Sequence, residues 1–123
     1  MSNDEAHSKR TPPTFARVAS HIRPGEWSTY GDISRAVQGD HMAARGVGRA
    51  AVTQPDFPAP WRVLNADGLI HPHWRDVDGH GPQEARRRLR SEGVLFDEDN
   101  RARQEFRVTW DVLRKRDIEA VDQ

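Results

Sequence analysis

Apolar residues recur with helical spacing in the first part of the chain. Phe15, Val18, Ala19 and Ile22 stand at positions i, i+3, i+4 and i+7, which predicts a helix over residues 14–23. The Pro24-Gly25 pair is a strong stop signal and ends it. The first predicted element is therefore a short amphipathic helix.

Two more helices follow in the pattern. Thr29 can cap the second, with Asp32, three positions on, as its partner in the capping bond, and Gly39 ends it. The third is predicted over residues 42–53, where Arg45 and Arg49 are four residues apart and share an outer face. The inward positions of the two helices are Ile33, Ala36, Val37, Val47, Ala50 and Ala51.

The second half of the chain mixes short apolar runs with turns. Residues 61–64 and 69–71 flank the turn signal Asn65-Ala66-Asp67-Gly68, which predicts a small β-hairpin in the place of a wing. A helix is predicted from Pro82 to Gly93. Residues 94–96 and 106–110 have strand patterns, and the charged segment from Val112 is compatible with a short helix or with disorder.

These elements predict one domain, mainly α with a small β-hairpin, in the order of a winged helix-turn-helix DNA-binding domain. It spans residues 14–96, between a flexible N-terminal arm, 1–13, and a partly ordered charged extension, 97–123. A chain of 123 residues has room for one modest core. No apolar run approaches the roughly 20 residues that span a bilayer, and no secretory signal opens the chain, so we expect a cytoplasmic protein without membrane contact.

Composition limits the chemistry. The absence of cysteine excludes disulfides, thiolate metal sites and cysteine nucleophiles. The 19 basic and 19 acidic residues balance to a net charge of zero, so any surface for nucleic acid must be local. All the basic residues except Lys9 and Lys115 are arginine, which suits bidentate contacts to phosphates and base edges, although a GC-rich genome produces the same bias.

Several motifs in one register point to a family. They are Ser28-Thr29-Tyr30-Gly31-Asp32-Ile33, Ala44-Arg45-Gly46-Val47-Gly48-Arg49-Ala50, Arg62-Val63, Asn65-Ala66-Asp67-Gly68 and Ser91-Glu92-Gly93-Val94. Over residues 15–94 the chain resembles the DNA-binding domain of alkylguanine-DNA alkyltransferases, and most closely their alkyltransferase-like relatives, which lack the reactive cysteine. The resemblance implies a protein that binds alkylated DNA by extruding the damaged nucleotide and does not repair it.

The acceptor cysteine of that family stands in a Pro-Cys-His-Arg-Val run, and here the run is Ala59-Pro60-Trp61-Arg62-Val63. Without a gap, Pro60 takes the cysteine position; with a one-residue deletion, Trp61 does. In both registers the thiol that attacks the alkyl carbon is missing. The loop before it is shorter than in the family, and Gln54 replaces the usual asparagine.

The resemblance also assigns roles to residues. Arg45 is the expected finger that fills the space of the extruded nucleotide, and Tyr30 is expected to press on its phosphate. The other expected DNA contacts are Thr29, Gly46, Gly48 and Arg49. The expected base pocket comprises Pro60, Trp61, Arg62, Val63 and Asn65, with the indole as one wall. Against this, both glycines could serve helix packing while Arg45 is merely solvated. Tyr30 could be a half-buried side chain just after a helix cap, and Trp61 could belong to the core of the wing.

Other interpretations remain open at the level of sequence. The chain could be a winged-helix regulator that reads duplex DNA without base flipping, or an interaction module that has lost DNA binding. His71, His73 and His80, with Asp76 and Asp78, are metal-ligand types, but their spacing matches no zinc pattern. We therefore expect no metal, no cofactor and no catalytic residue. The expected partners are double-stranded DNA with an alkylated guanine and nucleotide excision repair proteins, and the expected state is a monomer, nucleoid-associated when bound.

Overall fold

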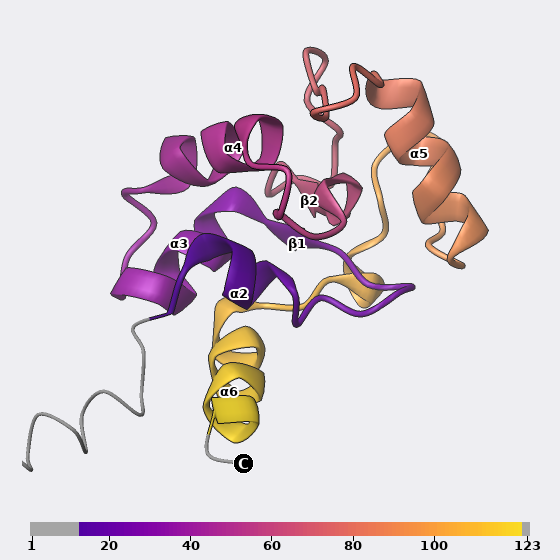
Figure 1. Ribbon diagram of the computed structural model, residues 1–123. Coiled ribbons are helices and arrows are strands. Elements are labelled where there is room, and N and C mark those ends of the chain that lie inside the picture. Colours follow the sequence, from indigo (N-terminus) through magenta and orange to yellow (C-terminus); the bar gives the residue numbers. More distant parts are fainter. Residues whose placement is uncertain (1–12, 122–123) are drawn as a thin grey trace, which may run out of the picture.

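The computed structural model describes residues 13–121, so the predicted N-terminal arm lies outside the described residues except for Pro13. Helices dominate these residues and enclose a very small sheet, which confirms the mainly helical class (Figure 1). The helices are α2 (Phe15–Ala19), α3 (Tyr30–Gln38), α4 (Ala44–Thr53), α5 (Pro82–Ser91) and α6 (Trp110–Val121). The shorter elements are the 3₁₀ turns η1 (Pro60–Arg62) and η2 (Gln104–Phe106) and the strands β1 (Ser28–Thr29) and β2 (Val63–Leu64).

The strand pairing differs from the predicted hairpin. β1 and β2 are parallel, with Ser28 opposite Val63 and Thr29 opposite Leu64. The predicted turn does form, because Asn65 N donates to the Leu69 carbonyl at 3.0 Å. Residues 69–71 form no strand, however, so the hairpin is wrong. The pairing joins segments far apart in the sequence, and a local pattern of apolar residues cannot reveal it.

The cap of α3 forms as predicted on the Thr29 side. Thr29 Oγ1 accepts from Asp32 N at 2.9 Å and donates to Asp32 Oδ2 at 2.8 Å. Gly39 ends the helix with φ +93°, a left-handed conformation that suits glycine. The first predicted helix is shorter than expected, since α2 ends at Ala19 and turns continue to Ile22.

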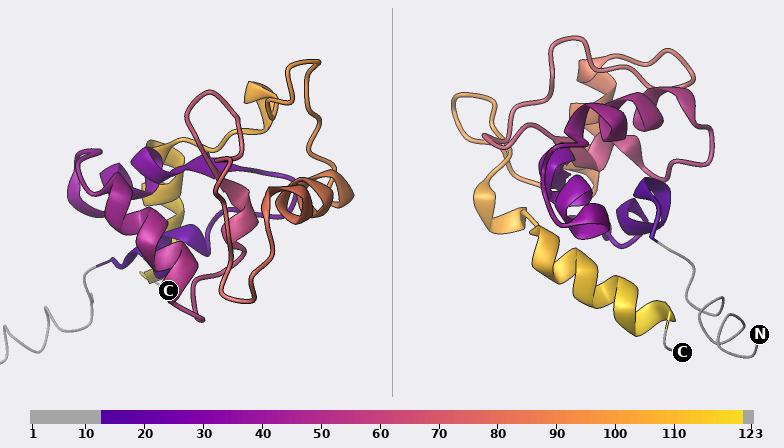
Figure 2. Two further views of the ribbon diagram at one scale, coloured as in Figure 1. Left: turned by 90° about the horizontal axis from the view of Figure 1, so that it is seen from above. Right: turned by 90° about the vertical axis from the view of Figure 1, so that its left-hand side faces the viewer.

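Two packed clusters hold the elements together. The first joins α2, α3, α4 and α6, and its buried members include Val18, Ile33, Val47, Val63 and Leu113. The second lies under α5 and contains Trp27, Leu64, Trp74, Ala85, Leu89 and Ala102. Figures 1 and 2 show α4 and α6 on opposite sides of α2 and α3. The outer surface of α4 is thus left uncovered by the other helices.

The C-terminal extension packs into the same body. Residues 106–108 run beside Trp27, with Trp27 N donating to the Phe106 carbonyl at 3.1 Å and Val108 N donating to the Trp27 carbonyl at 2.8 Å. The two predicted strands reduce to isolated bridges, Trp27 with Arg107 and Phe96 with Ala102. The charged tail is helical from Trp110 to Val121. No helix in residues 13–121 is long and apolar enough to cross a membrane.

Candidate nucleic-acid interface and base pocket

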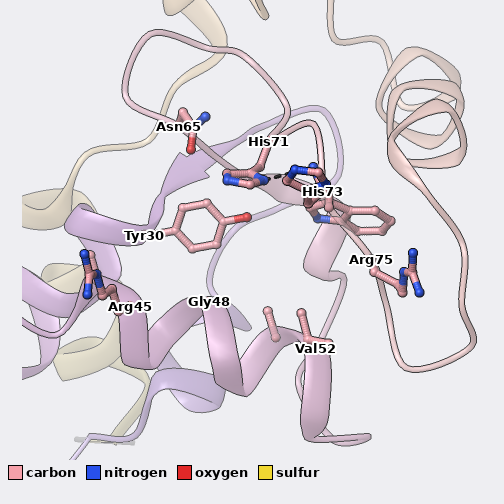
Figure 3. A pocket seen from close by; sticks show the side chains of 11 residues that line it. Tyr30, Arg45, Gly48, Val52, Asn65, His71, His73 and Arg75 are labelled. Carbon is pink, nitrogen blue, oxygen red and sulfur yellow. Dashed lines mark hydrogen bonds between the residues drawn. The ribbon is translucent and has the colours of Figure 1, made fainter.

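A cavity of about 390 Å³ lies between α4 and the loop that follows β2 (Figure 3). Its polar lining residues are Tyr30, Arg45, Asn65, His71, His73 and Arg75. Its apolar lining residues are Ala44, Gly48, Ala51, Val52 and Trp74. The volume is within the roughly 300–1,000 Å³ of small-molecule sites, and an apolar lining with a few polar groups is their usual chemistry. The cavity can therefore hold a planar group about the size of a base.

Tyr30 opens α3 directly after the Thr29 cap, so the cap fixes where the ring stands. Figure 3 shows the ring between α4 and the loop, with its hydroxyl pointing across the cavity. The hydroxyl has no hydrogen-bond partner among residues 13–121. Burial raises the pKa of Tyr30 to about 12, so at neutral pH it is an uncharged donor. Such a donor suits a phosphate oxygen.

Arg45 and Arg49 are exposed on the outer face of α4, as the sequence predicts. Neither makes an ion pair with a described residue, whereas many other arginines do, such as Arg62 with Glu92 and Arg116 with Glu26. No acidic residue occurs between Asp40 and Asp56 in the sequence. The neutral chain therefore has a local basic surface along α4, suited to a polyanion.

The two glycines of α4 have different surroundings. A Cβ at Gly48 would lie 3.7 Å from Cε1 of the Tyr30 ring, on the cavity side. A Cβ at Gly46 would lie 3.5 Å from Cε2 of Phe15 in α2, on the packed side. Gly48 therefore belongs to the site, while Gly46 serves helix packing.

One wall of the cavity is aromatic and imidazole-rich. Trp74 is 5% exposed and belongs to the second core cluster, so it is held rigidly. His71 and His73 are exposed, and His73 N donates to His71 Nδ1 at 3.0 Å, which fixes the His71 ring. Figure 3 shows Arg45 and Arg75 at opposite ends of the cavity.

Trp61 does not line the cavity, which corrects its assignment to the base pocket. Its Nε1 donates to Glu92 Oε2 at 3.0 Å, and Arg88 lies over its ring at 4.8 Å. Arg62 also pairs with Glu92, through Nη2 at 2.8 Å. Burial alone would raise the pKa of Glu92, but the bonds from Arg62 and Trp61 outweigh it and lower the pKa. These two residues of η1 are tied to the end of α5.

Of the other predicted site residues, some line the cavity and some do not. Asn65 lines the cavity, while Pro60 does not and Val63 is fully buried in the core. Thr29 is 3% exposed, and its hydroxyl is engaged with Asp32. The structure thus brings together Tyr30, Arg45, Gly48 and Asn65. Thr29, Arg62 and Val63 do not line the cavity, because capping, an ion pair and core packing already use their side chains. Pro60 opens the η1 turn, outside the cavity lining.

Sequence reasoning missed the far wall of the cavity. The sequence suggested His71 and His73 only as candidate metal ligands, and it assigned no role to Trp74 or Arg75. The local signal was weak, because an irregular loop carries them. The clearest available signal was the cluster of three aromatic or imidazole side chains within four residues, directly after the Asn65-Gly68 turn.

Asp76, Asp78 and His80 offer one ligand atom each within 4.8 Å of one another. The buried Asp76 is already engaged, because Oδ1 accepts from the backbone N of Asp78 and His80, and Oδ2 contacts His80 Nδ1 at 2.8 Å. Arg88 lies 3.9 Å from the same carboxylate. These contacts explain why the three side chains lie close together: Asp76 closes the loop of residues 76–80.

Comparisons with known proteins identify the family of this chain. The sequence model of the family described as 6-O-methylguanine DNA methyltransferase, DNA binding domain, matches residues 14–94. The chain therefore belongs to that family. A search of curated proteins gave no significant match.

Two solved structures of an alkyltransferase-like protein are similar over most of both chains. S. pombe Atl1 in complex with damaged DNA containing O6-carboxymethylguanine is 27% identical, with a TM-score of 0.58, and the alignment covers 86% of this chain and 96% of that chain. S. pombe ATL in complex with DNA is 28% identical, with a TM-score of 0.59 and the same coverage.

Proposed function

We propose that this protein is a damage sensor, which binds duplex DNA along α4, extrudes an alkylated guanine into the cavity and holds it there without repairing it. One observation carries the proposal: an exposed, unpaired Arg45 and the hydroxyl of Tyr30 both border one base-sized cavity. An extruded nucleotide requires a pocket for the base, a group to fill the gap in the stack and a donor for the rotated phosphate.

Arg45 supplies the gap-filling group. Its guanidinium plane can stack on neighbouring bases while it donates hydrogen bonds to the orphaned partner base. It stands in the first turn of α4 at the end of the cavity, where the extruded nucleotide would leave the duplex (Figure 3). Arg49, one turn on, would contact the phosphate backbone.

Family membership and the solved relatives support the choice of ligand. The family is named for a DNA-binding domain, and S. pombe Atl1 was solved with damaged DNA that contains O6-carboxymethylguanine. The similarity covers 96% of that chain. A purine with an alkyl substituent on its exocyclic oxygen suits a cavity with the Tyr30 and Trp74 rings in its lining.

We propose that no alkyl transfer follows binding. The chain has no cysteine, so the thiolate that displaces an alkyl group in the alkyltransferases has no counterpart. The lining offers the Tyr30 hydroxyl and two histidines, and none is a comparable nucleophile at an alkyl carbon. The bound lesion would then be the output, presented on the nucleoid to proteins of excision repair.

A titration of two duplexes that differ by one alkylated guanine tests this proposal. A sensor binds the alkylated duplex more tightly, whereas a winged-helix regulator prefers particular sequences and ignores the lesion. An interaction module without DNA function shows no salt-sensitive binding to either duplex. Equal affinity for the two duplexes would contradict the proposed function.

A further inference from the structure

The cavity is lined by nitrogen donors and by no carboxylate. Arg45, His71, His73 and Arg75 all contribute to its lining. The acidic residues nearest to His71, His73 and Arg75 in the sequence have other partners: Asp67 Oδ1 accepts from Leu69 N at 3.1 Å, and Asp76 is bound to His80. A group that accepts several hydrogen bonds is the chemical complement of this lining.

The two histidines are arranged to donate into the cavity. Because His71 Nδ1 accepts from His73 N at 3.0 Å, the proton of a neutral His71 ring is on Nε2. The two rings lie 5.7 Å apart, and both side chains are exposed. Among residues 13–121, His71 Nε2 and the ring nitrogens of His73 have no hydrogen-bond partner. Their donors are therefore available to a ligand.

The lining leaves room for a substituent on the base. A cavity of about 390 Å³ whose lining includes the Tyr30 and Trp74 rings and both histidines has room for a purine with a substituent of a few atoms. Hydrogen bonds to an ionised acceptor are roughly twice as strong as those between neutral groups. A carboxylate there accepts only, whereas a neutral amide of the same shape must also satisfy its own NH₂ group.

We propose that the cavity selects an extruded guanine whose O6 substituent ends in a carboxylate over one with a neutral substituent of the same shape, and that His71 and His73 make this distinction. The inference rests on the proposed function, since it requires the damaged base in the cavity. It adds the chemical class of the lesion and two residues that determine specificity.

Three duplexes that are identical except for one base test it: guanine, O6-carboxymethylguanine and its neutral isostere O6-carbamoylmethylguanine. We expect the carboxymethyl duplex to bind at least about tenfold more tightly than the carbamoylmethyl duplex. The double variant His71→Asn/His73→Gln should bring this ratio to within about twofold, mainly by weakening binding of the carboxymethyl duplex. Asparagine at position 71 keeps a side-chain acceptor for the backbone N of residue 73.

Two controls keep the outcomes distinct. Lys115→Gln removes a positive charge from α6, on the opposite side of the protein from α4, and should leave the ratio unchanged (Figure 1). His73→Gln alone changes one exposed side chain and should lower the ratio even if the double variant does not fold. Equal binding of the two lesions, or a ratio that persists in the folded double variant, overturns the inference while lesion recognition stands. If neither lesion is bound more tightly than guanine, the proposed function fails as well.

Discussion

The Asp32 carboxylate of α3 and the Arg107 guanidinium, 75 residues further along the chain, form an ion pair in which Arg107 Nε and Nη2 both donate to the same oxygen, Oδ2, at 3.0 and 2.8 Å. The same carboxylate accepts from the Thr29 hydroxyl and from Trp110 N. Because Thr29 caps the helix that begins at Tyr30, a residue beyond the family match at 14–94 supports the start of α3.

Arg107→Met should therefore destabilise the protein. Asp32 is 6% exposed, and the variant leaves its charge without the only ion-pair partner it has in the part of the chain that the structure describes, so we expect a loss of roughly 2–4 kcal/mol in the free energy of unfolding. Chemical denaturation measures this loss. Arg103→Met breaks the exposed pair with Glu105 and should cost less than about 1 kcal/mol. A similar loss of unfolding free energy in the two variants would show that the Asp32 ion pair stabilises the protein no more than an exposed ion pair does.

Arg45→Ala should remove the preference for alkylated DNA and leave the fold intact. Its side chain is exposed and unpaired, so thermal melting should be unchanged, while affinity for an alkylated duplex falls by about 1–3 kcal/mol. Arg49→Ala, on the same face of α4, should weaken binding to plain and alkylated duplexes equally. If Arg45→Ala retains the full lesion preference, another residue fills the gap.

Tyr30→Phe tests the hydroxyl apart from the ring. The ring contact with Gly48 is kept and one hydrogen bond is lost, so we expect affinity for the alkylated duplex to fall by about 0.5–1.5 kcal/mol, and Tyr30→Ala to be worse. Unchanged affinity in both variants would place Tyr30 outside the contact with the nucleotide.

The same tyrosine predicts a dependence of stability on pH. Burial raises the pKa of Tyr30 from 10.0 to about 12, so between these values the folded protein binds a proton that the unfolded chain has lost. The contribution to stability is complete below pH 10 and is lost as the pH rises towards 12. Tyr30→Phe lacks this contribution, so its melting temperature should fall less steeply over that window. Parallel curves would mean that the hydroxyl is not buried.

The two glycines of α4 make a matched pair. Gly48→Ala and Gly46→Ala should each stabilise the helix by up to about 1 kcal/mol, because their new Cβ atoms meet only ordinary contacts at 3.7 and 3.5 Å. Only Gly48→Ala narrows the cavity, so it alone should weaken lesion binding, by about 1 kcal/mol. Denaturation and titration of both variants check this. Equal loss of binding would place both glycines at the DNA.

The sequence correctly predicted the features that depend on residues close together in the chain, such as helix caps and helix faces. The Thr29 cap, the end of α3 at Gly39 and the exposed face of α4 with Arg45 all follow from spacing and capping. The parallel pairing of Ser28 with Val63 could not be predicted, because it depends on how the helices between them pack. A turn between two apolar runs suggested a hairpin instead.

The candidate site also combines residues that the sequence predicted with residues that it could not predict. Tyr30 and Arg45 were found through the family motifs, whose spacing is local. Trp61 was misplaced because its role depends on Glu92, which comes from the end of α5 and takes the indole N–H. Trp74 takes the place of the expected indole wall, held by the core under α5. No pattern along the chain distinguishes these two tryptophans.

We expect this protein to recognise an alkylated guanine without repairing it, and a single incubation can measure both. The protein is mixed with an equimolar duplex that contains one O6-alkylguanine; the complex is isolated against an excess of unmodified duplex, and both components are then analysed by mass spectrometry. We expect a complex that forms only with the alkylated duplex. The alkylated base should be recovered intact from it, and the protein mass should be unchanged. Restored guanine together with an alkyl adduct on any residue would contradict it, as would a complex that does not depend on the lesion.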